Sequence, residues 1–273
     1  MAHTTVRLAS GPGFALDDLR ILEDSRSWSE SGGAQECRIV FVRRGLFRLH
    51  HRDWRGVVDP SVAYVRPPGG EQRISHRPHV EDACTVLALD EALLGDVTRR
   101  PMPDRPVRTD GDLDLAHRTV FARARSGADG FELTERVLRL AAGLFEADDL
   151  SRHCSTPAHR RLADSARELL AGDPTRATVD GLARELGVSR SHLSRVFHAE
   201  TGETLTRFRR RLRIRAALDR IEAGATDLAT VATDLGFADH AHLTRSMRAE
   251  LGEPPSRVRA VLARSRREHR TSS

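Results

Sequence analysis

The sequence contains no apolar stretch as long as the roughly 18 residues that a membrane-spanning helix needs. Its first residues, MAHTTVRLASGPGFALDD, also lack the continuous apolar segment of a signal peptide. Only three cysteines are present, Cys37, Cys84 and Cys154. Their odd number and wide spacing exclude a disulfide framework and indicate a reducing compartment. We therefore expect a cytoplasmic protein that does not interact with membranes.

Lysine is absent, so all 44 basic residues are arginines. Coding bias in a GC-rich genome is the simplest cause, although the planar guanidinium also suits phosphates and guanine edges. The charge is uneven: residues 1–156 hold 22 Arg and 24 acidic residues, a net charge of −2, whereas residues 157–273 hold 22 Arg and 15 acidic residues, a net charge of +7. The basic C-terminal part is the one expected to bind nucleic acid.

The 273 residues are enough for about two domains. Short apolar and β-branched segments at 36–90, separated by turns such as Asp59-Pro60, predict the strands of a small barrel or sandwich. The proline-rich residues 91–110 are typical of a connector, and a helical period follows. One helical stripe suits a domain core or, as the second alternative, a dimer surface; it consists of Leu133, Val137, Leu140 and Leu144. We expect the domain boundary in the polar segment 148–158.

The C-terminal part contains an internal repeat. The first copy, residues 182–203, has the sequence LARELGVSRSHLSRVFHAETGE, and the second, residues 231–253, has the sequence VATDLGFADHAHLTRSMRAELGE. The copies align at an offset of 49 up to Gly187 and Gly236, and at an offset of 50 after them. The second copy therefore has one extra residue in its turn, as two helices joined by a tolerant loop allow.

Each copy has the pattern of a helix-turn-helix unit. A short amphipathic helix ends at a glycine that can take positive φ, and Ser189 or Asp239 is positioned to cap the next helix. In the first copy the second helix turns Leu193, Val196 and Phe197 inward. Its outward residues are polar, as a helix in the major groove requires: Arg190, Ser191, Ser194, Arg195 and His198. Between the copies, the segment FRRRLRIRAALDRIEAG predicts a linker helix. We expect some of its arginines to contact phosphates and the others to solvate the helix or pair with acids.

The C-terminal part resembles the DNA-binding domain of AraC/XylS-type regulators over about residues 160–262. The motifs that carry the resemblance are LARELGVSRSHLSRVF, RLRIRAALDRI, VATDLGFADHAHLTRSM and LGEPPSRVR. Where the family usually has Phe in the second recognition helix, this chain has Leu243 and Met247, which remain apolar. The resemblance implies that these positions face DNA: Ser191, Ser194, Arg195, His240, Ala241, Thr244 and Arg245.

The N-terminal strands resemble the cupin-type sensing domain of the same family, through FVRRGLFRLH, the Asp59-Pro60 turn and PPGGEQRISHRP. The resemblance implies a domain that binds an effector or mediates dimerisation. The expected partners are double-stranded DNA, RNA polymerase, an effector and, in a homodimer, a second copy of the chain. Activation and repression of transcription are both open.

A metal site in the N-terminal part is one of three alternatives. Cupin enzymes hold their metal with a His-x-His cluster, but His50 and His51 are adjacent and should point to opposite faces of a strand, so an enzyme is not expected. A different set of side chains suits zinc or another thiophilic metal such as Cu(I): Cys37, His76, His79 and Cys84. Cys37 and Cys84 are alternatively a redox pair, or small core residues near surface histidines.

The expected fold is multidomain α+β: an N-terminal cupin-like β-barrel with a helical connector, then an all-α domain with two helix-turn-helix motifs. The expected domains are a sensing domain at 1–98, a connector with a possible role in dimerisation at 99–156, the DNA-binding domain at 157–264 and a disordered tail at 265–273. The expected function is effector-controlled, sequence-specific regulation of transcription. The alternatives are a non-specific DNA-binding protein, and a cupin enzyme fused to a DNA-binding module.

Overall fold

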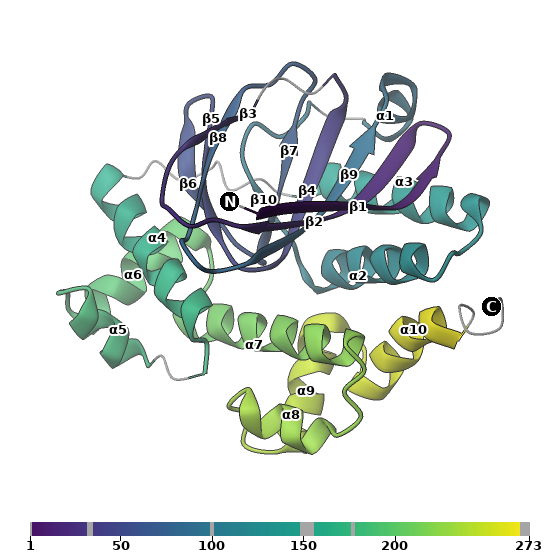
Figure 1. The fold of residues 1–273 in the computed structure, drawn as a ribbon. Coiled ribbons are helices and arrows are strands. Elements are labelled where there is room, and N and C mark those ends of the chain that lie inside the picture. The colour runs from purple at the N-terminus through teal and green to yellow at the C-terminus, as the bar shows by residue number, and fades with distance from the viewer. Residues whose placement is uncertain (1, 32–34, 99–100, 148–155, 176–177, 268–273) are drawn as a thin grey trace.

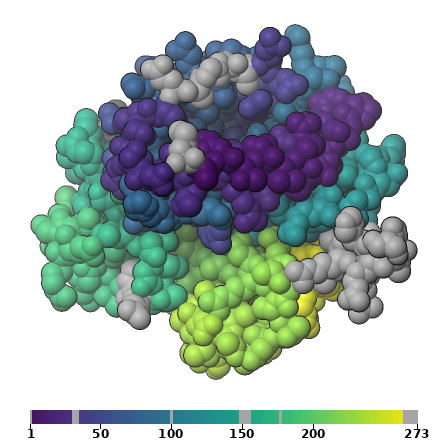
Figure 2. Space-filling view, viewed as in Figure 1, coloured from purple at the N-terminus to yellow at the C-terminus, as the bar shows by residue number. Residues whose placement is uncertain are grey.

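The computed structural model shows an N-terminal domain of strands and helices resting on a row of C-terminal helices (Figure 1). In Figure 2 the purple and blue N-terminal domain lies above the green and yellow-green helices, and the two parts are in close contact. The structure describes residues 2–31, 35–98, 101–147, 156–175 and 178–267.

Two antiparallel sheets form the N-terminal domain. The six-stranded sheet has the spatial order β1 (Ala2–Gly11), β2 (Phe14–Leu22), β9 (Asp82–Leu89), β4 (Cys37–Arg44), β7 (Val62–Arg66) and β10 (Val107–Arg108). The four-stranded sheet has the order β3 (Ser29–Ser31), β8 (Gln72–His76), β5 (Phe47–His51) and β6 (Trp54–Val58). Crossovers between non-consecutive strands in two facing sheets are typical of the double-sheet architecture of cupins, so the expected cupin-like β-barrel is confirmed.

The middle of the six-stranded sheet is buried on both faces, whereas its edge strand β1 is largely exposed. On one face, residues such as Val40, Tyr64 and Val86 pack against Phe47 and Leu49 of the four-stranded sheet. On the other face, the sheet is covered by α1 (Glu91–Val97), α2 (Gly111–Arg125) and α3 (Gly130–Glu146). Every residue of the central strand β9 is therefore buried, which explains its nearly continuous apolar sequence.

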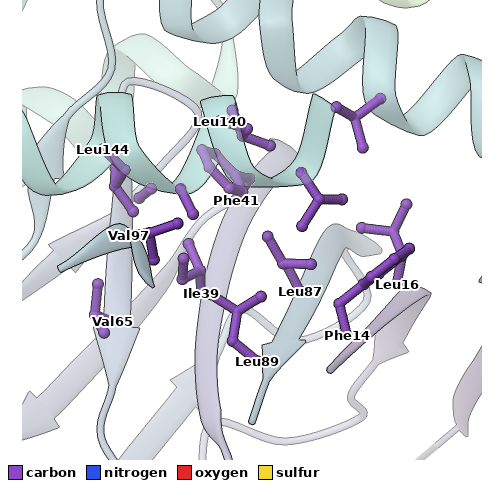
Figure 3. Close-up of a cluster of buried hydrophobic side chains, with 14 of the residues drawn as sticks. Phe14, Leu16, Ile39, Phe41, Val65, Leu87, Leu89, Val97, Leu140 and Leu144 are labelled. Atoms are coloured by element: carbon purple, nitrogen blue, oxygen red, sulfur yellow. The ribbon is translucent and has the colours of Figure 1, made fainter. Parts of the chain in front are cut away.

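The apolar stripe of α3 belongs to this core. Leu133, Val137, Leu140 and Leu144 are each 3% exposed or less. Figure 3 shows Leu140 and Leu144 above Ile39, Phe41 and Leu87 of the sheet. Of the two alternatives for this stripe, core rather than dimer surface is confirmed.

The sequence-based description of the N-terminal half was incomplete in two places. Three strands, β1, β2 and β3, precede the region in which strands were expected. The segment 91–110, interpreted as a connector only, contains α1 and the short strand β10, which extends the six-stranded sheet beside β7. Asp90 caps α1 by accepting a hydrogen bond from the backbone N–H of Leu93.

The C-terminal domain is helical throughout its described residues, as expected. It consists of α4 (Pro157–Gly172), α5 (Val179–Glu185), α6 (Arg190–Thr201), α7 (Leu205–Glu222), α8 (Leu228–Asp234), α9 (His240–Leu251) and α10 (Pro255–Arg267). Helix α10 extends to Arg267 and so includes the first residues of the segment 265–273, which was expected to be a disordered tail. The rest of that segment, residues 268–273, lies outside the described residues, as do residues 148–155 of the expected domain boundary. No helix in the described part of the chain combines the length and apolar character that crossing a membrane requires.

Candidate nucleic-acid interface

The two helix-turn-helix units have the same turn. Gly187 and Gly236 have φ of +66° and +73°. The N–H after each glycine, that of Val188 or Phe237, donates to the carbonyl of Ala183 or Ala232 at 2.9 Å. This is the Schellman arrangement that ends a helix at a left-handed residue, and glycine adopts that conformation without a steric cost from Cβ. Both predicted turn glycines are confirmed.

The recognition helices, α6 of the first unit and α9 of the second, begin at the predicted caps. Ser189 accepts a hydrogen bond from the N–H of His192 at 3.2 Å, and Asp239 accepts one from the N–H of His242 at 2.6 Å. These bonds satisfy N–H groups that have no partner inside the helix. The cap follows the glycine by two residues in the first unit and by three in the second, which places the extra residue of the second copy in the turn.

The inward faces of the recognition helices form two separate apolar cores. Leu193 and Phe197 of α6 pack with α4, α5 and the first part of α7. Leu243 and Met247 of α9 pack with α8, α10 and the second part of α7. All four side chains are 0% exposed. The second core is therefore closed with Leu243 and Met247 at the two positions where the sequence comparison expected Phe.

The predicted DNA-binding residues lie on the outer faces. Ser194 and Thr244 are half-buried. The others are exposed: Arg190, Ser191, Arg195, His198, His240, Ala241 and Arg245. The Thr244 Oγ1 is buried without a hydrogen-bond partner among the described residues, so the accessible part of this side chain is not its hydroxyl.

Arg195 and Arg245 occupy equivalent positions in the repeat. Neither guanidinium forms a hydrogen bond or an ion pair with another residue in the described ranges, whereas Arg190 lies 3.6 Å from Asp180. An exposed guanidinium in this position can donate two parallel hydrogen bonds to a guanine edge or to phosphate oxygens.

The arginines of the linker helix α7 include residues that pair with acids, as the sequence indicated, and one that binds backbone carbonyls, which it did not. Arg211 and Arg215 are buried and face acidic residues, and they are therefore unavailable to phosphates. Arg213 donates to the carbonyls of Pro174, Thr175 and Gly236 at 2.7–2.8 Å. This one side chain joins the α4–α5 loop, the linker helix and the turn of the second unit.

The residues considered for a metal are not brought together. Cys37 lies in the core between the six-stranded sheet and α3, while Cys84 lies in the core between the two sheets. The His76 Nδ1 is 2.5 Å from the Asp82 Oδ2, and His79 lies in a turn with φ of +60°. Among the described residues, no group of three or more His, Cys, Asp or Glu side chains is placed to hold a metal ion.

The two cysteines are also placed poorly for redox chemistry. Burial raises the pKa of the Cys37 thiol to about 11, and burial together with the neighbouring Asp82 raises that of Cys84 further. Thiolates are the reactive species, and both side chains are only 1% exposed. Of the alternatives, the arrangement favours small core residues. Of the two histidines expected at the surface, His79 is exposed, but His76 lies in strand β8 beside Asp82 and is buried.

Comparisons with known proteins agree with the geometry of the C-terminal domain. Residues 182–260 match the model of a family described as a helix-turn-helix domain. A search of curated proteins found no match.

The solved structures that are similar to the chain include the following three. ToxT from Vibrio cholerae with a bound unsaturated fatty acid is 12% identical with a TM-score of 0.38, over 93% of this chain and 97% of that chain. An AraC-type transcriptional regulator from Chromobacterium violaceum is 21% identical with a TM-score of 0.37, over 40% of this chain and 97% of that chain. A cupin superfamily protein from Desulfitobacterium hafniense is 11% identical with a TM-score of 0.29, over 33% of this chain and 79% of that chain.

The paired turns, caps and cores, together with the family match, define a domain of the helix-turn-helix class over residues 182–260. The helix-turn-helix domain is of the AraC type, as the sequence motifs indicated.

Proposed function

We propose that the chain binds a specific sequence of double-stranded DNA through α6 and α9 and thereby regulates transcription. The observation that carries the proposal is the pair of outward faces on two recognition helices with matching turns, caps and cores. On these faces, the proposed contacts to bases or backbone are Arg190, Ser191, Ser194, Arg195 and His198 in the first unit and His240, Ala241, Thr244 and Arg245 in the second. RNA polymerase is the proposed protein partner.

The test begins with selection of binding sites from a random double-stranded DNA library by the full chain. Arg195→Ala and Arg245→Ala should each weaken binding to the selected sequence by about 1–3 kcal/mol, because a guanidinium at a base edge is lost. Arg139→Ala is the matched control: Arg139 is exposed on α3, far from the recognition helices in sequence, and pairs with Glu135 one helical turn away. Binding that enriches no sequence and depends only on salt would support the non-specific alternative.

A cavity between the two domains supports control by a small anionic effector. It has a volume of about 300 Å³ and lies between strands β5 and β6 and helix α4. Four arginines line it: Arg48, Arg55, Arg160 and Arg161. The acidic side chain in the lining is Asp164, whose pKa is raised by burial. Guanidinium groups on two walls suit a carboxylate or phosphate that contacts both domains.

The effector proposal is tested with inorganic phosphate and citrate as probes, each compared with chloride at equal ionic strength. Ligands that bind the folded state raise its melting temperature. We expect this shift in the wild type and in Arg139→Gln, and its loss in the Arg55→Gln/Arg161→Gln double variant. An equal shift in all three proteins would show that the anions act elsewhere.

Homodimerisation is a separate part of the proposal, which a native mass measurement tests. A dimer would use a surface other than the apolar stripe of α3, because that stripe is buried within one chain.

A further inference from the structure

Helix α2 of the N-terminal half contributes to two apolar cores at once. Leu113, Val120 and Ala124 pack in the core beneath the six-stranded sheet. Ala122 packs in the core of the second helix-turn-helix unit, with Leu115 against it. The core of the first unit is built from residues of α4 to α7 and contains no residue of the N-terminal half among its described members. The second unit is therefore the one whose core an N-terminal helix completes.

The beginning of α2 contacts the end of the recognition helix α9 through backbone atoms. Gly111, the first residue of α2, is buried. A Cβ at this position would lie 1.6 Å from the carbonyl oxygen of Glu250 and 3.2 Å from the Cα of Leu251. Both of these atoms belong to the last turn of α9. Since backbone atoms cannot move aside as a flexible side chain does, only glycine allows this approach.

Buried ion pairs join α2 to the linker helix α7. Arg118 is 1% exposed and contacts both Asp219 and Glu222 of α7. In the opposite direction, Arg215 of α7 lies 3.2 Å from Asp114 of α2. Arg118, Arg215 and Asp114 are buried, each with a partner on the other helix. Sliding or rotating one helix against the other would therefore leave a charge unpaired in the interior.

The linker helix carries this connection on to α9. Arg211 of α7 is 2.8 Å from the carboxylate of Glu250, and it also donates to the backbone carbonyl of Thr109, just before α2. Glu250 thus meets Gly111 through its backbone and Arg211 through its side chain. The last turn of α9 is held from two sides by contacts that involve the segment 109–118.

We propose that α2 is a positioning element for the second recognition helix, with Gly111, Asp114 and Arg118 as its positioning residues. Through them the N-terminal domain determines where the outward face of α9 lies relative to that of α6. This inference rests on the proposed DNA binding, and it adds a route by which the state of the N-terminal domain acts on one of the two DNA contacts.

A pair of glycine variants tests the proposal in the full chain. Gly111→Ala introduces a methyl group against the end of α9. Gly130→Ala is the matched control, because Gly130 is also the first residue of a helix capped by Asp, and a Cβ there meets open space. The probe is the DNA duplex selected by the wild type, and the half-site bound by α9 is identified as the one whose hydroxyl-radical protection Arg245→Ala weakens.

We expect Gly111→Ala to lose protection at the α9 half-site, with at least a tenfold loss of affinity, while protection at the α6 half-site and the melting temperature of the N-terminal domain change little. Gly130→Ala should match the wild type. Equal protection in the two variants, or an equal loss at both half-sites in Gly111→Ala, would overturn the proposal. A wild type that enriches no DNA sequence would instead overturn the proposed function.

A charge variant keeps the test decisive if Gly111→Ala does not fold. Asp114→Asn removes the partner of Arg215 with little change of shape, and Asp112→Asn removes an exposed carboxylate from the same turn as its control. Loss of protection at the α9 half-site in Asp114→Asn, but not in Asp112→Asn, supports the positioning role. Identical footprints for the two variants contradict it.

Discussion

The arginines of the C-terminal domain divide into two sets with different environments. Arg195 and Arg245 are exposed on the recognition helices, whereas Arg211 and Arg215 are 2% and 4% exposed and pair with acids. The sequence alone distinguishes the exposed arginines from the buried ones only in part. The outward position of Arg195 follows from helical periodicity, which is local. The partner of Arg215 is Asp114 in the other half of the chain, and no local pattern indicates that contact.

Gly187 illustrates a residue whose role is local and could be predicted. Its φ of +66° is strained for other residues, but a Cβ there would meet no atom within 4 Å. Gly187→Ala should therefore destabilise the first unit by about 1–2 kcal/mol through the backbone alone. Urea unfolding measures this loss, and hydrogen exchange should locate it in α5 and α6. Gly130→Ala, with ordinary φ and open space, is the control; equal stability of the two variants would contradict the assignment.

His117 predicts a pH dependence of stability. It is 2% exposed, its ring stacks on Phe41 and its Nε2 lies 2.9 Å from the Thr85 Oγ1. Burial, followed by the nearby Arg118, Arg43 and Arg215, lowers its pKa well below the usual value. The unfolded chain therefore binds a proton at this histidine below about pH 6.5 that the folded chain does not bind, and stability falls as pH falls through that range.

Below about pH 6.5, His117 should lower the free energy of unfolding by about 1.4 kcal/mol for each pH unit. His117→Gln retains a polar group near Thr85 and should remove this slope from the difference in unfolding free energy between pH 7 and pH 5. The measurement is chemical unfolding at both pH values. A variant with the same acid sensitivity as the wild type would show that His117 is not the group responsible.

At the scale of elements, the sequence was most informative where local pattern and tertiary role agree. Helices α5, α6, α8 and α9 follow from periodicity, capping residues and turn glycines. Strand β1 could not be recognised in this way, because it is an edge strand whose residues 2–7 are all exposed and lack an apolar alternation. The interpretation of 91–110 as a connector missed β10 because its partner, β7, is distant in sequence.

Helix α4 is held on the N-terminal domain by a buried ion pair. Arg167 donates to the Asp59 Oδ2 at 2.8 Å and to the carbonyl of Val57 at 2.9 Å. Burial acts to raise the pKa of Asp59, but the charge of Arg167 and hydrogen bonds from Ser61 outweigh it and hold the pKa below its usual value. The carboxylate is therefore charged and depends on Arg167 for compensation.

Arg167→Met should destabilise the chain by about 3–5 kcal/mol, because it leaves a buried carboxylate unpaired. Adding Asp59→Asn removes that charge while keeping an oxygen for Ser61, so the double variant should recover part of the loss. Arg139→Met on the exposed face of α3 should stay within about 0.5 kcal/mol of the wild type. Thermal unfolding compares the four proteins; a double variant no more stable than Arg167→Met would show that the pair is not the source of the effect.

For the whole molecule, the N-terminal domain holds the two helix-turn-helix units through different elements. The first unit is connected through α4, which packs on β6 and pairs with Asp59 and Arg48. The second unit is connected through α2, which packs on α9 and α10. The cavity lined by arginines lies on the α4 side. An effector there would act first on the first unit, while α2 connects the opposite side of the barrel to the second.

The N-terminal half completes the core of the second unit but not that of the first. A fragment of residues 157–273 should therefore differ from the full chain mainly in the second unit. The core of the first unit is complete without the N-terminal half, whereas that of the second unit loses Ala122 and Leu115, and Arg215 loses Asp114. Hydrogen exchange should therefore show similar protection of α5 and α6 in the fragment and in the full chain, but faster exchange in α8, α9 and α10 of the fragment. The reverse order, or uniform loosening of both units, would show that α2 does not support the second unit. The Gly111→Ala substitution in the full chain should cause the same faster hydrogen exchange in α9 as the fragment shows, since both changes remove the contact of Gly111 with the last turn of α9.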